Sequence, residues 1–226
     1  MEGPAAAEEL AALSRIADAL SLPIDDAQAR ALLHHLALLE RWNQTYNLTA
    51  VRDPAAMRAQ HLADCLTAVP AMQRWLAERP PGAAPARLLD VGSGGGLPGV
   101  PLAVMLPGVQ VTCADAVAKK VAFLRQVAGA LRLPNLHAVH GRVETLQLPP
   151  FDVVTARAFA SLADFVRWTT ALRAPQGVWM AMKGRRPDDE IAALPAEIEV
   201  FHVEPLSVPG LDAERCLVWM RPRRAP

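Results

Sequence analysis

The sequence has few cysteines, no net charge and no long apolar segment. Its three cysteines, Cys65, Cys113 and Cys216, are far apart and odd in number, which argues against a disulfide framework or a thiolate zinc site. Each is expected to be a small buried residue. No apolar run approaches the roughly 18 residues of a membrane span, and the opening MEGPAAAEEL carries acids where a secretory signal carries bases. We therefore expect a cytoplasmic protein without a membrane segment or a metal site.

The chain also lacks the basic surplus of a nonspecific nucleic-acid binder, because its 23 basic and 23 acidic residues balance. Residues 1–80 hold 7 basic and 10 acidic residues, and residues 81–226 hold 16 and 13, which is a mild asymmetry. Two basic clusters stand out, KGRRP at Lys183–Pro187 and RPRR at Arg221–Arg224. Taken by themselves, they indicate solvated surface.

What the chain does have, at its start, is helical periodicity. Apolar residues recur at helical spacing in EELAALSRIADAL, and a second helix is predicted from Asp25 or Asp26 through ARALLHHLALLERWNQTYN. A third is predicted from the N-cap Asp53 to a stop at Pro70. We therefore expect residues 1–80 to form a helical subdomain.

Two polar residues of the predicted third helix lie on one face of it. His61 and Asp64 are three residues apart, a spacing at which side chains of a helix meet. They could orient one another in a site, but the sequence favours an ion pair on the surface.

After a linker at RPPGAAP, short apolar runs alternate with amphipathic stretches, which predicts βαβ units and a mostly parallel sheet. The predicted strands are RLLDV, VQVTCAD, LHAVHG, FDVVTARA, GVWMAMK, IEVFHVEPL and RCLVWMRP. The predicted helices are PGVPLAVML, AKKVAFLRQVAGALRL, SLADFVRWTTAL and PDDEIAAL. The last two strands are joined by a loop too short for a crossover, so they should form an antiparallel hairpin at one edge. The sequence thus predicts an α/β domain over residues 81–226.

Four of the thirteen glycines fall within Gly92–Gly96, directly after the first predicted strand and its acid, Asp90. In an open parallel sheet, ligands bind beyond the carboxyl ends of the strands, beside the first strand-to-helix turn. Glycines accept positive φ and let a ligand touch the backbone, and the amides that open the next helix attract an anion. The loop therefore predicts a nucleotide-like cofactor.

Two cofactor classes compete for this loop. Gly94, Gly96 and Gly99 fit G-x-G-x-x-G, and Asp115 follows as a ribose acceptor would in an NAD enzyme. However, that motif opens too late after the strand, and Asp90 would face a doubly charged pyrophosphate. S-adenosylmethionine suits DVGSGGG better, because its ammonium and sulfonium are positive and its ribose hydroxyls can donate to Asp115. An NAD-dependent oxidoreductase is the alternative.

A series of segments from about Leu32 to Met220 resembles the successive signatures of one family. They are RWNQTYNLTAVRDP, HLADCL, DVGSGGGLPGVPLAV, KKVAFLRQV, RVE, FDVVTARAFASL, MKG and LDAERCLVWM. On these segments the sequence resembles the RsmG (GidB) family of bacterial small-subunit rRNA methyltransferases. The glycine loop alone indicates only a methyltransferase, whereas GLPG together with TARAFASL is far more specific. The chain departs from the family at Thr155–Ala156, where a serine often precedes the arginine.

The resemblance implies a Rossmann-like class I methyltransferase fold, with a seven-stranded sheet and an N-terminal helical subdomain. It implies methyl transfer from S-adenosylmethionine to nitrogen 7 of one guanine in 16S rRNA, as free RNA or in the small ribosomal subunit. It places Gly92 and Leu97 near the methionine and sulfonium, and Val143 and Glu144 near the adenine. The cofactor contacts expected from the family motifs, the glycine loop and the ribose argument are Gly92, Gly94, Leu97, Asp115, Val143, Glu144 and Arg157.

The chemistry of nitrogen 7 agrees with the sequence. Methylation of an exocyclic amine commonly uses an [ND]-P-P-[FYW] loop after the fourth strand, and TARAFA stands there instead. Methylation of a pyrimidine carbon needs a cysteine nucleophile, and no cysteine is placed for it. Nitrogen 7 has a free lone pair at neutral pH and needs no general base, so orientation is the main task. We therefore assign no catalytic residue.

An RNA substrate needs cations for its phosphates and a means of presenting the base. Lys183, Arg185 and Arg186 follow the fifth predicted strand, on the cofactor side of the sheet, and are predicted RNA contacts. Phe159 could stack on the base, although packing in the core is the simpler interpretation. Three alternatives stay open: a noncatalytic RNA-binding or assembly module, a methyltransferase acting on another RNA, and one acting on a small molecule or protein. We expect a monomer.

Overall fold

The computed structural model describes residues 4–223, with side chains from residue 7 onward except at residue 54. The end of the basic cluster Arg221–Arg224 therefore lies outside the described residues. The first part of the chain forms α1 (Pro4–Ala19), α2 (Asp26–Tyr46), α3 (Pro54–Met57), the π-helical η1 (Arg58–Ala63), α4 (Asp64–Leu66) and α5 (Ala68–Ala77).

The rest of the chain alternates strands and helices, as the sequence predicts. The strands are β1 (Arg87–Val91), β2 (Gln110–Asp115), β3 (Leu136–His140), β4 (Phe151–Arg157), β5 (Arg173–Lys183), β6 (Ile198–Leu206) and β7 (Arg215–Pro222). The helical segments between them are α6 (Gly99–Met105), α7 (Ala118–Ala130), η2 (Val143–Thr145), α8 (Leu162–Thr169), η3 (Thr170–Leu172) and α9 (Asp188–Ala192).

Helix α2 begins where its cap residue predicts. The Asp25 carboxylate accepts from the Gln28 amide at 2.7 Å, and the Gln28 side chain accepts from the Asp25 amide at 3.0 Å. This reciprocal pair satisfies two backbone donors that the first helical turn leaves free. Leu32, Leu36 and Leu39, which lie on one face of this helix, are buried.

The prediction of one third helix that stops at Pro70 is wrong. The segment is helical from Pro54, passes through the π-helical turn η1, and restarts at Ala68 as α5, which runs to Ala77. Pro70 is tolerated because it lies in the first turn of α5, where its missing amide hydrogen would have no helical partner.

All seven strands belong to one sheet, in the order β3-β2-β1-β4-β5-β7-β6. The first five are parallel, and β7 pairs antiparallel with both β5 and β6, which confirms the predicted edge hairpin. The strand order reverses between β1 and β4, so the carboxyl end of β1 is the switch point at which ligands of such sheets bind. The glycine loop follows β1 directly.

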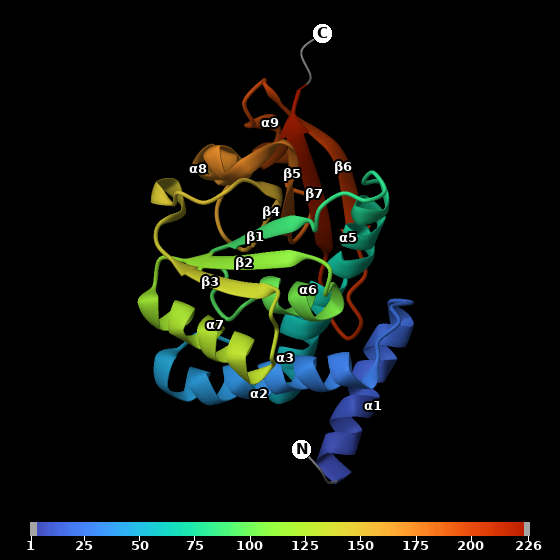
Figure 1. The fold of residues 1–226 in the computed structure, drawn as a ribbon. Helices are drawn as coiled ribbons and strands as arrows, with labels where there is room; N and C mark the ends of the chain where they lie inside the picture. The colour runs from blue at the N-terminus through green and yellow to red at the C-terminus, as the bar shows by residue number, and fades with distance from the viewer. Residues whose placement is uncertain (1–3, 224–226) are drawn as a thin grey trace.

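Both faces of the sheet are buried (Figure 1). On β1, Leu88 packs with the core on the side of α6 and α7, and the next residue, Leu89, packs with the core on the side of α8. Helix α2 lies outside α6 and α7, and its leucines join the first of these cores. The helical N-terminal part therefore shares one continuous core with the sheet, and the boundary at residue 80 stays a prediction.

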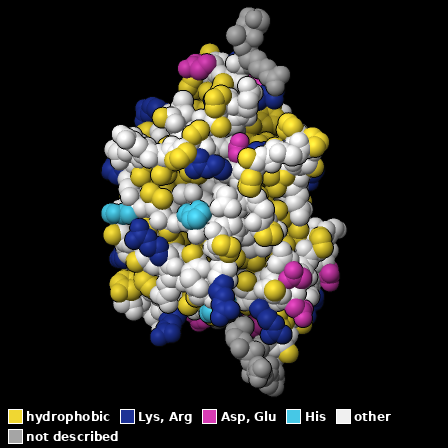
Figure 2. Space-filling view, in the orientation of Figure 1, with side chains coloured by type: hydrophobic (Ala, Val, Ile, Leu, Met, Phe, Trp, Pro, Cys, Tyr) yellow, Lys and Arg dark blue, Asp and Glu magenta, His cyan; other side chains and the backbone are white. Residues whose placement is uncertain are grey.

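The face of the molecule that Figure 2 shows has no large patch of charges of one sign. Lys and Arg side chains lie there singly or in small groups among neutral and hydrophobic ones. Within residues 4–223, no helix is both long and apolar enough to cross a bilayer.

Candidate functional site

The glycine loop needs its glycines for backbone conformation and for space. Gly92, Gly94 and Gly96 have φ of 68°, 55° and 82°, a region that residues other than glycine rarely adopt. A Cβ at Gly96 would lie 2.5 Å from Val100 Cγ2 in α6, so this glycine also lets the loop pack on the following helix. The loop thus exposes bare backbone at the carboxyl end of β1.

Asp115, at the end of β2, holds the loop in place. Its Oδ2 accepts from the Gly94 amide at 3.0 Å, and its Oδ1 accepts from the Val117 amide at 2.9 Å. The Lys120 ammonium lies 3.7 Å from the same carboxylate, which is largely buried. Each carboxylate oxygen can accept a second hydrogen bond, so Asp115 is still able to take a ribose hydroxyl.

Asp90 does not face the cofactor site, and the prediction that it does is wrong. Its carboxylate is fully buried, and its Oδ2 accepts from the Gly99 amide at 2.9 Å at the start of α6. The helix N-terminus attracts the carboxylate and turns it beneath the loop. Burial raises the pKa of Asp90 to about 6, and its Oδ1 has no hydrogen-bond partner among the described residues.

A cavity of about 180 Å³ opens beside the loop. Its lining comes from the carboxyl ends of β1 and β2, the turn after β3, and the segment that follows β4. The lining residues are Val91, Gly92, Ala114, Asp115, Ala116, Gly141, Arg142, Val143, Glu144, Phe159 and Trp168. The structure therefore brings together four of the predicted cofactor residues, Gly92, Asp115, Val143 and Glu144.

Val143 and Glu144 enter the cavity on the short turn η2. The Val143 side chain is buried, and the Glu144 carboxylate pairs with the Arg142 guanidinium at 3.2 Å. A hydrogen bond from its own backbone amide, with help from Arg142, lowers the pKa of the Glu144 carboxyl. This corner offers an apolar surface edged by an acceptor, which suits an adenine ring.

Leu97 and Gly94 lie outside the cavity lining. The Leu97 side chain packs in the core, and its amide donates to Ser93 O at 3.1 Å within the loop. The Gly94 amide is already bonded to Asp115. Cofactor contacts at both residues stay predictions.

Phe159 lines the cavity next to the glycine loop. A Cβ placed on Gly92 would lie 2.5 Å from Phe159 Cδ2, so the ring rests on the glycine. The ring also meets Trp168 edge-on, with centroids 5.8 Å apart. The preceding residue, Ala158, has φ of 50°, a strained value that sets the direction of this loop. Phe159 is thus both a core contact and a wall of the cavity.

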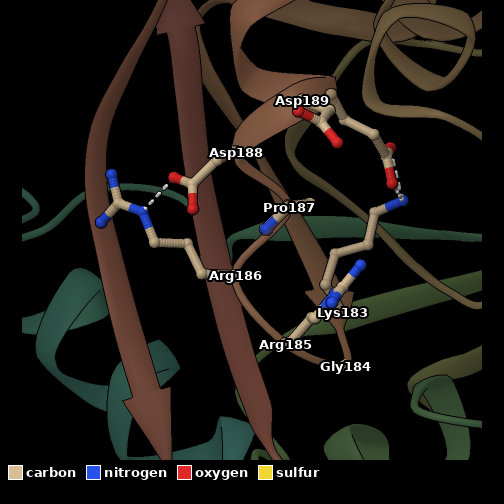
Figure 3. A pocket seen from close by; sticks show the side chains of 8 residues that line it. Lys183, Gly184, Arg185, Arg186, Pro187, Asp188 and Asp189 are labelled. Atoms are coloured by element: carbon tan, nitrogen blue, oxygen red, sulfur yellow. Dashed lines mark hydrogen bonds and ion pairs between the residues drawn. The ribbon is translucent and has the colours of Figure 1, made fainter.

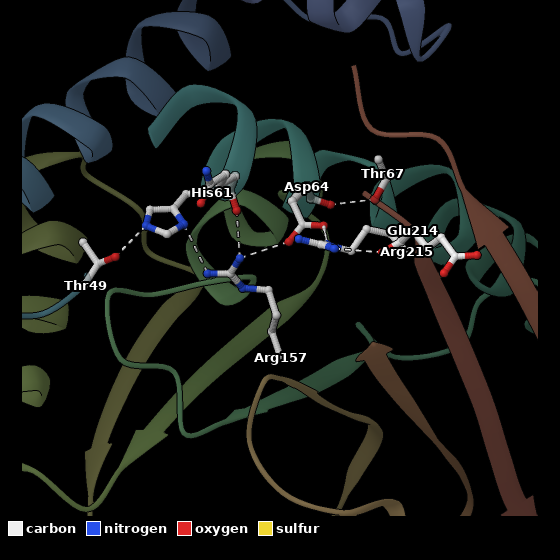
Figure 4. A network of polar contacts seen from close by, with 8 residues as sticks. Thr49, His61, Asp64, Thr67, Arg157, Glu214 and Arg215 are labelled. Atoms are coloured by element: carbon white, nitrogen blue, oxygen red, sulfur yellow. Dashed lines mark hydrogen bonds and ion pairs between the residues drawn. The ribbon is translucent and has the colours of Figure 1, made fainter. Parts of the chain in front are cut away.

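Arg157 does not line the cavity, because its guanidinium is bonded to the helical N-terminal part of the chain (Figure 4). Its guanidinium donates to Asp64 Oδ2 and Gln60 O, both at 3.0 Å, and lies 3.5 Å from His61 Nδ1. Asp64 also accepts from Arg215 at 3.2 Å. The network ties the helical N-terminal part to the ends of β4 and β7.

The expectation of a surface ion pair between His61 and Asp64 is therefore wrong. Both side chains are buried, and Asp64 pairs with two arginines from the sheet. Burial, with a contribution from the nearby Arg157, lowers the pKa of His61. His61 Nε2 is 2.7 Å from Thr49 Oγ1, which fixes the turn after α2.

Two of the three predicted RNA contacts are paired with acids (Figure 3). Lys183 Nζ donates to both oxygens of Glu190, at 3.0 and 2.8 Å, and to Ala160 O at 2.9 Å. Arg186 pairs with Asp188 at 2.6 Å, and the figure shows Lys183 and Arg186 turned to opposite sides of their loop. Arg185 forms no ion pair with any described residue. The surrounding hollow, about 560 Å³, is lined by residues 183–190, which include as many acids as bases.

Sequence reasoning missed one contact of the loop. His35, in the middle of α2, is fully buried, and its Nε2 lies 2.8 Å from Gly95 O. Burial lowers the pKa of His35 to about 4, so the ring is neutral and can donate to that carbonyl. No motif announces this residue, because its role depends on how α2 packs against the loop.

The cysteines are as predicted. All three are buried and none lines the cavity, and burial raises the pKa of the Cys113 thiol well above its ordinary value. No group of three or more His, Cys, Asp or Glu side chains within the described part of the chain is arranged to hold a metal ion.

Comparison with known proteins gives a consistent result. Residues 28–218 match the family model described as rRNA small subunit methyltransferase G, also called GidB. The chain is 60% identical to a protein of Acidovorax ebreus over 214 residues, covering 93% of this chain and 94% of that protein. It is 62% identical to one of Leptothrix cholodnii over 207 residues, covering 92% and 93%. Both relatives are named Ribosomal RNA small subunit methyltransferase G.

Solved structures share the fold at low identity. TrmN from Thermus thermophilus aligns with 22% identity and a TM-score of 0.53, over 70% of this chain and 49% of its own. MtNAS in complex with MTA and tNA aligns with 14% identity and a TM-score of 0.54, over 84% and 71%. With the sheet order, these likenesses confirm the predicted Rossmann-like architecture.

Proposed function

The chain belongs to the rRNA small subunit methyltransferase G family, and we propose that it methylates nitrogen 7 of a guanine in bacterial 16S rRNA. The methyl donor is S-adenosylmethionine. Support for the target atom comes from the family resemblance and from the chemistry of the segment after β4. With a ribosomal substrate, we propose that the enzyme acts in the cytoplasm.

The cavity suits the donor in its chemistry. Bare backbone at Gly92 matches the amino-acid end of the cofactor, the Asp115 carboxylate can accept from ribose hydroxyls, and Val143 with Glu144 suits the adenine. When bound, the cofactor supplies an electrophilic methyl group on a sulfonium. Sites for whole cofactors are commonly about 300 Å³ or larger, so the 180 Å³ cavity would hold only part of the cofactor, and a shift of Phe159, which lines it, would enlarge it.

The observation that carries the proposal is the absence of an amine-binding loop where an amine methyltransferase has one. Arg157, the last residue of β4, is followed by Ala158 and Phe159, where such an enzyme has an acid or amide followed by two prolines. The described cavity lining contains no histidine and no cysteine, and its two carboxylates are engaged with the loop and with Arg142. These surroundings suit a nucleophile that attacks unaided.

The work of the protein is then to orient the reactants. The loop, fixed by Asp115 from one side and by His35 from another, gives the cofactor one position. Methyl transfer requires nitrogen, methyl and sulfur in line, with reacting atoms about 3 Å apart before reaction. Because guanine nitrogen 7 has no proton to lose, no residue has to accept one. Among the predicted phosphate contacts, Arg185 is the one we retain, since it has no acidic partner.

The test compares rRNA from a strain with the gene deleted and from its parent. We expect 7-methylguanosine to be lost at one site of 16S rRNA, seen by nucleoside mass spectrometry and by chemical cleavage at that base. The purified enzyme and S-adenosylmethionine should restore the mark on 16S rRNA or small subunits from the deletion strain. An unchanged 16S pattern in the deletion strain would overturn the proposal.

A further inference from the structure

Three large hydrophobic side chains are exposed in the described part of the chain, and two of them lie at one surface. Tyr46, the last residue of α2, is 40% exposed, and Val117, just before α7, is 37% exposed. The Lys119 ammonium is 5.9 Å from the centre of the Tyr46 ring. The end of α2 and the start of α7 therefore form one surface with an aromatic ring and a cation.

Two cations of this surface have no acidic partner. Neither Lys119 nor Arg52 forms an ion pair with a described residue, and the Arg52 guanidinium instead donates to Asn47 Oδ1, beside Tyr46, at 3.3 Å. In contrast, Lys183 and Arg186 are each held by a carboxylate. Unpaired cations are the ones available to neutralise phosphates.

The surface borders the cofactor cavity. Ala116 lines the cavity, and the next amide, that of Val117, donates to the Asp115 carboxylate at 2.9 Å. A group bound on Tyr46 would thus lie on the rim of the site where the target base must be presented.

We infer that Tyr46, Lys119 and Arg52 form a nucleotide platform, on which an unpaired nucleotide adjacent to the target guanine stacks while the two cations hold its phosphates. The inference rests on the proposed function, because an RNA substrate supplies that nucleotide. Bases that are splayed out of a structured RNA are commonly held by stacking on aromatic side chains, with basic groups along the backbone. A stable protein interface buries about 1,200–2,000 Å² in total, far more than one ring and one valine provide.

The edge of the sheet offers a matched control. Phe201 in β6 is also 40% exposed, and the Arg221 guanidinium lies 4.8 Å from the centre of its ring. Arg221 is paired with Glu199, and β6 is the edge strand farthest along the sheet from β3. Phe201 thus has the exposure of Tyr46, but its neighbouring cation is paired and it lines a different cavity from the cofactor cavity.

The experiment measures methyl transfer to 16S rRNA or small subunits from the deletion strain, with wild type, Tyr46→Ala, Tyr46→Phe and Phe201→Ala. We expect Tyr46→Ala to raise KM for RNA roughly ten-fold, the scale set by loss of one base–aromatic stack. Its Kd for S-adenosylmethionine and its Tm should stay near the wild-type values. Tyr46→Phe should restore KM, and Phe201→Ala should leave it unchanged.

A second pair of variants tests the cations. Lys119→Gln removes a charge at the start of α7, and Arg132→Gln removes an exposed charge just beyond its other end. Because each phosphate contact releases counterions, Lys119→Gln should reduce the slope of log KM against log salt by about 0.7–0.9, and Arg132→Gln should not.

The outcomes distinguish a failure of the nucleotide platform from a failure of the proposed function. If wild type does not methylate 16S rRNA, the proposed function fails. If wild type is active and Tyr46→Ala keeps its KM, or Phe201→Ala raises KM equally, the platform is overturned. An unchanged KM for naked RNA with a raised KM for assembled subunits would point to a ribosomal protein and would also overturn it.

Discussion

Phe159 rests directly on Gly92, with its Cδ2 2.5 Å from the position that a Cβ at residue 92 would occupy. The two residues are 67 positions apart in the sequence, and they meet because β1 and β4 are neighbours in the sheet. The bare backbone of Gly92 and the ring of Phe159 are therefore adjoining walls of the cavity. Substitutions at these two residues should therefore change the affinity for the cofactor and the stability of the fold to different extents.

Replacing Phe159 with alanine should open the cavity. The cofactor then has no ring to displace, so S-adenosylmethionine should bind several-fold more tightly, while Tm falls because a core contact is lost. Phe159→Trp, which fills more space, should weaken binding. Calorimetric titration measures the affinity of both variants. Equal affinity of all three proteins would contradict this role.

Replacing Gly92 with alanine should lower cofactor affinity, because the methyl group enters space that the backbone and Phe159 need. It should also cost about 1–2 kcal/mol of folding stability, since alanine is strained at positive φ. Gly129→Ala is the control: it lies within α7 with no atom near the added Cβ, and should be stabilising by about 0.5–1 kcal/mol. Urea unfolding and calorimetry distinguish the two.

Replacing Asp115 with alanine removes the acceptor for the Gly94 and Val117 amides. We expect at least ten-fold weaker binding of S-adenosylmethionine, because the glycine loop and the ribose both lose the carboxylate that accepts their hydrogen bonds. We also expect the free energy of unfolding to fall by about 1–3 kcal/mol. Asp115→Asn keeps one acceptor oxygen and should be intermediate. Wild-type affinity in the alanine variant would mean that the cofactor lies elsewhere.

Replacing Asp64 with alanine should be strongly destabilising. It leaves Arg157 and Arg215 partly buried without their carboxylate, and breaking such a pair typically costs about 3–5 kcal/mol. The exposed pair Arg167–Asp164 is the control, and Arg167→Ala should cost less than about 1 kcal/mol. Chemical denaturation measures both, and similar losses in the two variants would show that the network adds no stability.

Two buried groups should make stability depend on pH in opposite senses. The pKa of His35 is lowered to about 4, so its contribution is full above its ordinary value of 6.5 and is lost as pH falls towards 4. The pKa of Asp90 is raised from 3.8 to about 6, so stability is lost as pH rises through that range. Between pH 6.5 and 4, His35→Gln should therefore lose less stability than wild type, and Asp90→Asn should lose more.

Each difference should be about 3 kcal/mol at full extent, since each pKa is shifted by a little more than two units and one unit corresponds to about 1.4 kcal/mol. Urea unfolding at pH 4.5 and 7 gives the comparison. Parallel pH curves for the three proteins would show that neither group is linked to folding.

The strands and the edge hairpin could be predicted from the sequence, because their signals are local. The run of β7 is mostly apolar, that of β6 mixes apolar with charged residues, both are followed or preceded by turn residues, and both match their predicted limits. The third helix could not be delimited in this way. Pro70 carries a stop signal, but its effect depends on where the helix restarts, and packing around η1 decides that.

The candidate site likewise has features that local sequence predicts and features that depend on tertiary packing. By itself, the sequence predicted the glycine loop and the acid at the end of β2, because each lies at a fixed place relative to a strand, whereas the turn after β3 came from the family resemblance. Only the tertiary structure decided which partner each charged side chain has. Arg157 is bonded to Asp64, 93 residues away, Lys183 to Glu190, and Asp90 to the amide at the start of α6. A buried or half-buried charge takes the nearest opposite partner, and the fold, rather than the local sequence, determines which partner is near.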